Sequence, residues 1–268
     1  MKISVIIPTF NRSSFLIPAI NSVKSQTFKV DEIIVIDDGS SDNTKEVLAN
    51  LDIKYIYQRN KGVSSARNRG IKESKNEWVA FLDSDDIWEK EKIEKHVSFH
   101  KTNSNTLCSY TDEIWNRNGK IIKLKDYQKK EEPTFLNSLR LCKIGVSTFF
   151  CNKTIFENIG YFDEKLQVCE DYDLWLRILK KYKIKYLDFK LTLKNAGHEN
   201  QLSFNTKLID KYRIKALEKH LNSNFSEEVK AELKYKINIL TLGAQKHNNI
   251  ELLKECDVML NSLKAGKN

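Results

Sequence analysis

The chain has 268 residues, of which 40% are hydrophobic and 30% are charged. A chain of this length can bury one large core, or one core with a small appended lobe, which excludes a tail or a linker. No run approaches about 18 apolar residues, and the opening "MKISVIIPTF" lacks the layout of a signal peptide. The five cysteines form no CxxC pair, which predicts reduced thiols that lie mostly in the core. We therefore expect a cytoplasmic protein.

The formal net charge is +9 and the pI is about 9.1. The lysines are spread along the chain without a platform of interleaved aromatic and basic residues, so we expect no nucleic acid partner. The densest basic stretch, residues 177–186, could instead lie against an anionic membrane surface or an acidic acceptor. This allows a peripheral location at the inner face of the cytoplasmic membrane.

The N-terminal part of the chain alternates between two periodicities. Short β-branched or aromatic runs, typical of strands buried on both faces, occupy residues 2–8, 32–37, 53–58 and 78–83. Helical spacing lies between them at residues 13–26, 41–51 and 62–74, with Ser13 and Asp42 as candidate N-caps. This order predicts an α/β fold with a mostly parallel, doubly wound sheet flanked by helices. In such sheets ligands bind beyond the carboxyl ends of the strands.

The pattern changes after about residue 104. Residues 107–115, 119–125 and 146–152 predict further strands in a mixed-sheet half. Residues 171–182 have helical spacing, with an apolar face of Leu174, Trp175, Ile178 and Leu179. Residues 206–264 predict two or three amphipathic helices, one of which opens at Phe225 and Ser226.

Three carboxylates follow the fourth predicted strand in "FLDSDD", residues 81–86. Asp83 and Asp85 can both point toward one ligand if the chain turns there. A hard divalent cation, Mg²⁺ or Mn²⁺, would relieve their repulsion and would take further ligands from a substrate phosphate. Alternatively the cluster caps a helix predicted over residues 87–100, and for Asp86 both interpretations stay open.

A second acidic segment, "DDGSSDNT" (residues 37–44), follows the neighbouring strand. Asp37 and Asp38 could accept hydrogen bonds from ribose hydroxyls or from a base N–H, or the segment could be only a tight loop. No phosphate-loop lysine follows, and no GxGxxG comes after the first strand. These absences disfavour P-loop and dinucleotide sites.

Two further segments carry candidate site residues. In "NKGVSSARNRG" (60–70), Arg67 can make a forked contact with a phosphate or a base carbonyl, whereas Arg69 fits a surface ion pair. In "CEDYDLW" (169–175), Glu170 and Asp171 stand at the start of a helix. The positive end of the helix can hold one of them ionised as a general base. Acidic residues at this position are equally explained by simple N-capping of the helix.

Taken together, these segments resemble glycosyltransferase family 2, whose catalytic domain has the GT-A fold. Five motifs occur in the family's order across residues 1 to about 200: "SVIIPTFNR" (4–12), "VIDDGSSDNT" (35–44), "NKGVSSARNRG" (60–70), "FLDSDD" (81–86) and "EDYDLWLR" (170–177). The resemblance implies a GT-A domain at residues 1–204, with a nucleotide-binding half (1–103) and an acceptor-binding half (104–204). Residues 205–268 would form a C-terminal helical extension that the resemblance does not cover.

The resemblance also implies roles for particular residues. Pro8, Thr9 and Asn11 would line the nucleotide pocket, Asp38 would contact the base, Arg67 would hold the nucleotide, and Asp83 would approach the ribose. Asp85 matches the last position of the DxD motif, which coordinates Mn²⁺ or Mg²⁺ on the donor diphosphate. Asp171 matches the catalytic base of inverting members. Further candidates are Asp37, Ser84, Asp86, Glu170, Trp175 and His198.

The implied activity is metal-dependent, inverting transfer of a single sugar from a nucleotide-sugar donor, with UDP-sugar favoured. The acceptor would be a hydroxyl of a glycan or a lipid-linked precursor, in bacterial surface polysaccharide or lipooligosaccharide synthesis. None of the tryptophans follows an arginine, so the QxxRW motif of processive members is missing. A sugar nucleotidyltransferase and a non-catalytic nucleotide-sugar-binding protein remain as alternatives.

Overall fold

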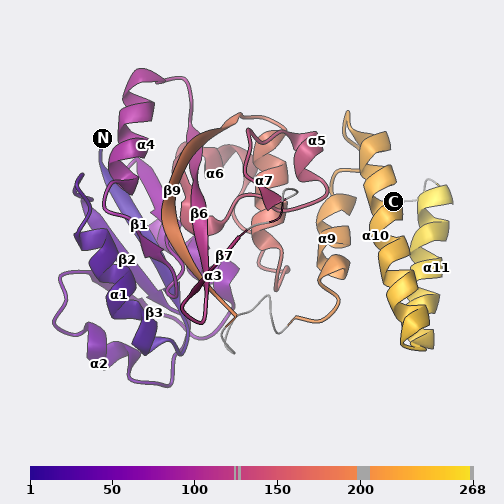
Figure 1. Ribbon diagram of the computed structural model, residues 1–268, viewed down its shortest axis with the longest axis horizontal. Coiled ribbons are helices and arrows are strands. Elements are labelled where there is room, and N and C mark those ends of the chain that lie inside the picture. The colour runs from indigo at the N-terminus through magenta and orange to yellow at the C-terminus, as the bar shows by residue number, and fades with distance from the viewer. Residues whose placement is uncertain (124, 126–127, 198–205, 266–268) are drawn as a thin grey trace.

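The computed structural model describes residues 1–123, 125, 128–197 and 206–265. Within them one nine-stranded sheet runs in the order β3-β2-β1-β4-β8-β6-β9-β5, and β7 pairs with β6 outside this path. The sheet and its covering helices form one end of the molecule, and the C-terminal helices form the other (Figure 1). His198 lies outside the described residues.

The four predicted N-terminal strands are confirmed. They are β1 (Ile3–Thr9), β2 (Glu32–Asp37), β3 (Lys54–Tyr57) and β4 (Trp78–Phe81), and all three pairings between them are parallel. Helices α1 (Ser13–Lys24), α2 (Thr44–Leu48) and α3 (Val63–Glu73) connect them. The side chains of β1 are fully buried, as expected for a strand covered on both faces.

Helix α3 packs very closely on β1 because its interior position 70 is a glycine. A Cβ atom at Gly70 would lie 2.3 Å from Cγ2 of Ile6. Any side chain there would push α3 away from the sheet, and with it the residues that α3 carries to the strand ends.

One aspartate caps two helices. Asp42 Oδ1 accepts the backbone N–H of Thr44 at the start of α2, and Asp42 Oδ2 accepts that of Ser13 at the start of α1. Both predicted N-caps are displaced by one residue: the N-cap position of α1 is Arg12 rather than Ser13, and that of α2 is Asn43 rather than Asp42. The capping group comes from another loop, so local sequence does not reveal it.

The second half of the sheet is mixed, as predicted. Strand β8 (Phe149–Asn152) is antiparallel to β4 and β6 (Cys108–Arg117), β9 (Ile184–Ala196) is parallel to β6, and β7 (Lys120–Ile122) is antiparallel to β6. The description as mostly parallel thus fits the first half of the sheet and not the second.

The helix predicted over residues 87–100 begins later than expected. Ile87 and Trp88 form the short strand β5, antiparallel to β9, and α4 spans Lys92–Thr102. The indole N–H of Trp88 donates to the carbonyl of Ser147 at 2.7 Å. Pairing with a distant strand and burial of the indole prevail here over local helix propensity.

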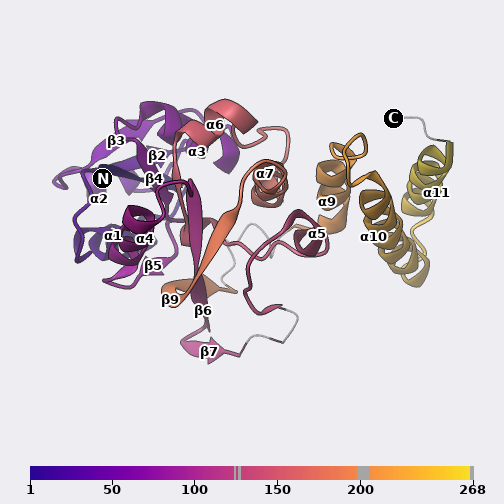
Figure 2. The same ribbon diagram turned by 90° about the horizontal axis from the view of Figure 1, so that it is seen from above.

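The remaining helices lie toward the C-terminal end. Short helices α5 (Phe135–Ser138) and α6 (Thr154–Ile159) precede α7 (Glu170–Leu179). Of its predicted apolar face, Leu174, Trp175 and Ile178 are buried and Leu179 is half-buried. The helix also buries a second face, with Tyr172 and Leu176, which was not predicted. The predicted amphipathic helices are α9 (Ile209–Glu218), α10 (Ser226–Lys246) and α11 (Ile250–Ala265). Figure 2 shows α9 between α7 and α10. Among the described residues, no helix combines the length and apolar composition needed to span a bilayer.

The cysteines are free thiols, and all except the half-buried Cys142 are buried. This confirms the prediction of reduced cysteines that lie mostly in the core.

Candidate functional site

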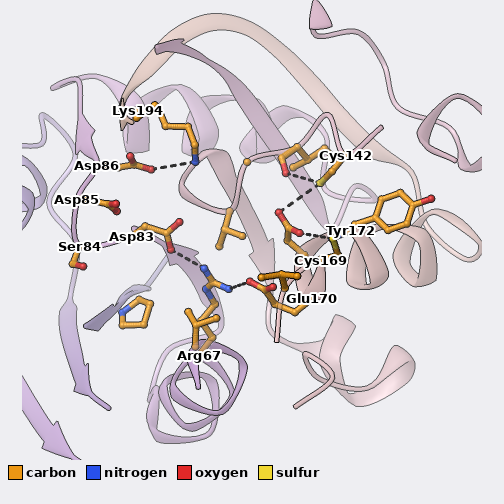
Figure 3. A pocket seen from close by; sticks show the side chains of 18 of the residues that line it. Arg67, Asp83, Ser84, Asp85, Asp86, Cys142, Cys169, Glu170, Tyr172 and Lys194 are labelled. Atoms are coloured by element: carbon orange, nitrogen blue, oxygen red, sulfur yellow. Dashed lines mark hydrogen bonds and ion pairs between the residues drawn. The ribbon is translucent and has the colours of Figure 1, made fainter. Parts of the chain in front are cut away.

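A cavity of about 1080 Å³ opens at the carboxyl ends of β1, β2 and β4. Its walls come from segments far apart in the sequence (Figure 3). The predicted site residues that line it are Pro8, Thr9, Asn11, Asp38, Arg67, Asp83, Ser84, Asp85, Asp86, Glu170 and Asp171. Two candidates, Asp37 and Trp175, do not line it.

The turn after β4 separates its carboxylates into different environments. Asp85 Oδ2 forms an ion pair with Arg12 Nη1 at 3.0 Å, inside the cavity wall. Asp86 Oδ2 accepts the hydroxyl of Ser147 at 2.7 Å, and Asp86 Oδ1 accepts the backbone N–H of Asn195 at 3.2 Å. Asp86 is thus committed to holding the turn, which makes Asp85 the better candidate for a metal ligand.

Burial raises the pKa of Asp86 to about 7, although Lys194 lies 3.8 Å from its carboxylate. The neighbouring carboxylates of Asp85 and Asp83 add to this rise. Lys194 in turn has its pKa raised, chiefly by Asp86, so the ammonium stays charged within the acidic cluster.

Arg67 links the two acidic segments. Its Nη2 donates to Asp83 Oδ1 at 2.8 Å, and its Nη1 donates to Glu170 Oε1 at 2.6 Å. Burial alone would lower the pKa of Arg67, but the two carboxylates raise it, so the guanidinium remains a buried cation. In this structure Arg67 fixes the relative position of the turn after β4 and the start of α7.

The aspartates after β2 have separate tasks. Asp38 lines the cavity while it accepts hydrogen bonds from Gln58 Nε2 and from the backbone N–H groups of Lys61 and Gly62, at 2.7 to 2.9 Å. Asp37 is buried, and accepts the Tyr55 hydroxyl at 2.7 Å and the Ser40 N–H at 2.8 Å. Asp37 therefore shapes the loop and does not reach the cavity.

The start of α7 presents Glu170 and Asp171 after an unusual backbone conformation. Cys169 has φ of 63°, in the left-handed region that non-glycine residues rarely adopt. Asp171 Oδ1 accepts its neighbour's N–H, from Tyr172, at 2.7 Å, and Asp171 Oδ2 accepts the thiol of Cys142 at 3.5 Å. Burial raises the pKa of Glu170 to about 7 in spite of Arg67, and the adjacent Asp171 adds to the rise.

Trp175 belongs to the core beneath the cavity. Its indole N–H donates to the carbonyl of Ile144 at 2.9 Å, and its ring packs on Phe149 with a centroid distance of 4.3 Å. Since Ile144 lines the cavity, Trp175 supports the wall from behind.

Sequence reasoning missed several charged and aromatic lining residues: Arg12, Glu113, Trp115, Lys130, Lys194 and Arg213. Arg12 lies inside a motif that the sequence analysis quoted, so its position next to the cavity could have been noticed. The others come from β6, β9 and α9 and from the segment before α5, where no local pattern distinguishes them from solvated side chains.

The donor set fits a divalent cation that is bound together with a diphosphate. Among the described residues, no group of three or more His, Cys, Asp or Glu side chains is placed to hold a metal ion. Asp83 and Asp85 offer carboxylates in the cavity wall, and Mg²⁺ or Mn²⁺ is commonly bound by one or two carboxylates plus substrate phosphates. In addition, the buried hydroxyl of Thr9 has no hydrogen-bond partner among the described residues, as expected of a group awaiting a polar ligand.

Comparison with solved structures identifies the fold. The crystal structure of S. aureus TarS 1-349 in complex with UDP-GlcNAc superposes with a TM-score of 0.77 at 22% identity, covering 98% of this chain and 80% of that one. The mannosyltransferase PcManGT from Pyrobaculum calidifontis, in complex with GDP-Man and Mn²⁺, superposes with a TM-score of 0.64 at 14% identity, covering 100% of this chain and 76% of that one. The architecture is therefore GT-A.

Sequence comparison identifies the family. An uncharacterized glycosyltransferase of Rickettsia conorii is 38% identical over 71% of this chain, but the match spans only about a third of that protein, 32%. The Escherichia coli UDP-Glc:alpha-D-GlcNAc-diphosphoundecaprenol beta-1,3-glucosyltransferase WfgD is 32% identical over 91% of this chain and 94% of that protein. The sequence model of "Glycosyl transferase family 2" matches residues 4–158. The chain therefore belongs to glycosyl transferase family 2.

Proposed function

We propose that the protein transfers one sugar from a UDP-sugar to a hydroxyl of a lipid-linked or other glycan acceptor in surface polysaccharide or lipooligosaccharide synthesis. The transfer inverts the anomeric configuration and depends on a divalent cation. The observation that carries this proposal is that Asp38, Asp85 and Asp171, from three distant segments, open onto one cavity. Relatives named as UDP-Glc-dependent transferases with diphosphoundecaprenol-linked acceptors support the choice of donor and acceptor.

The donor would bind at the ends of β1, β2 and β4. The unpartnered Thr9 hydroxyl would receive a polar atom of the nucleoside, and the remaining lone pair of the Asp38 carboxylate would accept a base or ribose donor. The volume of about 1080 Å³ exceeds the size of most single-ligand pockets, so donor and acceptor can occupy the cavity together.

Asp83 and Asp85 would hold the cation together with the donor diphosphate. A divalent cation there stabilises the charge that develops on the leaving nucleoside diphosphate. Arg12 and Lys194 add positive charge at the same wall, so the chain itself also offsets the charge of the diphosphate.

Asp171 would act as the general base. The Cys142 thiol and the Tyr172 N–H hold its carboxylate in place. Asp171 takes the proton of the acceptor hydroxyl while that oxygen attacks the anomeric carbon from the face opposite the diphosphate. The bond from the anomeric carbon to the diphosphate oxygen breaks, and nucleoside diphosphate leaves.

Replacement of the base tests this proposal. Asp171→Asn should lower the turnover number by on the order of 100- to 10,000-fold, because the amide cannot accept the proton. Binding of UDP should be unchanged, since Asp171 lies on the acceptor side. Turnover is followed as release of UDP in the presence of Mn²⁺, and UDP binding as a shift in thermal unfolding.

Asp188→Asn is the matched control, because Asp188 is exposed on β9 and does not line the cavity. Near-normal turnover in Asp171→Asn would reject Asp171 as the base. Release of UDP that needs no divalent cation would reject the metal dependence.

A further inference from the structure

The C-terminal helix α9 forms part of the wall of the cavity. Two residues of α9 line the cavity: Ile209 in its first turn and Arg213 in its second. They lie in the same cavity wall as Cys169, just before α7, and Glu170 and Asp171, the first two residues of α7. The family match ends at residue 158, so this wall is built by a part of the chain that the match does not cover.

Arg213 has unused hydrogen-bonding capacity. Its Nη1 donates to Asp210 Oδ1 at 3.0 Å, one turn earlier on α9. Its Nε is buried and has no hydrogen-bond partner among the residues that the structure describes. A buried donor without a partner is energetically unfavourable, so a ligand that accepts a hydrogen bond from Nε would relieve that penalty.

The ion pairs around Arg213 contain more cations than anions. Asp210 is shared with Lys236, whose Nζ lies 3.6 Å from it, and Lys236 also lies 3.4 Å from Glu232. Glu232 pairs in turn with Arg140 at 2.8 Å. Three cations thus share two carboxylates in this network of α9, α10 and the segment after α5, which leaves an excess of positive charge beside the cavity.

Arg213 lies on the side of the cavity that holds the proposed base. The thiol of Cys169, just before α7, donates to the carbonyl of Ile209 on α9 at 3.9 Å. Burial opposes ionisation of Arg213, but Asp210 raises its pKa. Cys142 donates to Asp171, and Cys169 precedes Asp171 by two residues. Figure 3 shows these two cysteines across the cavity from Ser84 and Asp85, where the donor diphosphate would lie.

We infer that Arg213 binds a phosphate or diphosphate group carried by the acceptor, so that the C-terminal helices complete the acceptor site. The inference rests on the proposed function for the identity of the two sides of the cavity. A guanidinium with free N–H groups suits phosphate oxygens, and a diphosphate linked to the acceptor sugar would lie beyond the hydroxyl that Asp171 deprotonates. Arg213 could also bind the diphosphate of the donor, and the test below distinguishes that possibility from binding of the acceptor's phosphate.

The test uses undecyl diphosphate as a probe that requires no knowledge of the acceptor sugar. The full chain is first saturated with UDP and Mn²⁺, which fills the donor side. Binding of the probe is then measured by calorimetry and by the shift in thermal unfolding, with undecanol as the uncharged comparison. The wild-type protein should bind the diphosphate and not the alcohol.

Arg213→Ala should weaken probe binding by about 10- to 100-fold, because a charge-assisted hydrogen bond is lost. Arg213→Lys keeps the charge without the fork and should give an intermediate loss. Lys215→Ala removes an exposed cation from the same helix, outside the cavity, and should bind the probe like the wild type. The affinity for UDP should be the same in all three variants.

Equal binding of the probe by Arg213→Ala and the wild type would overturn the inference, and so would no binding by the wild type. A loss of UDP affinity in Arg213→Ala would assign Arg213 to the donor diphosphate instead, which also overturns it. The proposed function fails separately, if UDP itself does not bind to the wild-type protein.

Discussion

Asp85, the residue proposed to ligate the metal, is already paired with the guanidinium of Arg12. Both side chains are largely buried, with 18% and 9% of their surfaces exposed, so the pair is weakly screened by solvent. A metal ion and a guanidinium compete for the same carboxylate oxygen. If a divalent cation and a diphosphate bind at Asp85 as proposed, Arg12 would release Asp85 and contact the phosphate oxygens instead.

This competition predicts opposite effects of one substitution. Arg12→Ala should tighten binding of Mn²⁺ in the absence of nucleotide by roughly 10-fold, because Asp85 loses its competitor. The same variant should weaken binding of UDP in the absence of metal by roughly 10-fold, because a phosphate contact is lost. Mn²⁺ binding is read from the electron paramagnetic resonance signal of the free ion, and UDP binding from calorimetry with chelator.

Arg69→Ala provides the control for Arg12, since Arg69 is a half-buried arginine that donates to the Tyr57 carbonyl and does not line the cavity. Both affinities should stay at wild-type values in that variant. If both affinities change in the same direction in Arg12→Ala, Arg12 has only a structural role at this wall.

The sequence predicted which carboxylates line the cavity, but it did not predict which side chains pair with or hydrogen-bond to the cavity residues. Asp38, Asp85 and Asp171 follow or begin predicted elements, so the periodicity of the chain located them. The partners of Arg67 are 16 and 103 residues away, and only the folded structure brings them together. The competing interpretations of Asp86 could be separated only by its contacts with Ser147 and Asn195.

At the element scale, α4 presents a buried polar row to the sheet. Lys92 lies 3.5 Å from Nε2 of His96, His96 Nδ1 lies 2.8 Å from Ser109 Oγ, and Ser109 Oγ lies 2.8 Å from Nε2 of His100. His100 Nδ1 is 3.0 Å from the Thr106 carbonyl, which can only accept. One assignment satisfies the whole chain of contacts: each imidazole is neutral, with the proton on Nδ1.

This row should make the fold sensitive to acid. Burial lowers the pKa of His100 from 6.5 to about 4. Below about pH 6.5 the unfolded chain therefore takes up a proton that the folded chain does not, so stability falls as the pH decreases toward 4. The contribution of His100 to this loss between pH 7 and pH 5 should be about 2 kcal/mol.

The free energy of unfolding is measured by urea titration at pH 7 and at pH 5. In His100→Gln, the decrease between these two values should be smaller than in the wild type by about 2 kcal/mol. His247→Gln should show the wild-type difference, because His247 is exposed after α10. An unchanged difference in His100→Gln would mean that the pKa of His100 is the same in the folded and the unfolded chain.

The start of α4 shows why element boundaries are harder to predict than element types. The strands of the first half depend on local runs of β-branched residues, and all four were found. Strand β5 has two residues, Ile87 and Trp88, and exists only because β9 lies beside it. No local pattern in residues 87–91 distinguishes that pairing from a first helical turn.

At the scale of the whole molecule, the C-terminal helices share a core with the catalytic part. Tyr172 and Leu176 of α7 pack in one buried cluster with Leu217 of α9 and Leu233 of α10. The division into a domain at 1–204 and an extension at 205–268 remains a prediction. The shared cluster favours cooperative unfolding of the two parts over independent behaviour.

A cavity in this core tests the cooperativity. Leu217→Ala should lower the free energy of unfolding by about 2–5 kcal/mol, because Leu217 is completely buried. All four tryptophans, at positions 78, 88, 115 and 175, precede the extension. Tryptophan fluorescence and far-ultraviolet circular dichroism should therefore shift to the same lower urea midpoint.

Leu242→Ala on α10 is the matched control, since Leu242 is 66% exposed and its truncation should change stability by less than about 0.5 kcal/mol. A fluorescence midpoint that stays at the wild-type value in Leu217→Ala would show that the extension unfolds by itself.

The fastening of the acidic turn by β9 has a consequence for biosynthesis. Asn195 holds the turn through the carbonyl of Asp85 and the carboxylate of Asp86, from a position 110 and 109 residues further along the chain. While the ribosome is still adding those residues, the four parallel strands can already pair, but the turn lacks its two contacts with Asn195. The turn therefore gains these two contacts only late in translation, after β9 has left the exit tunnel.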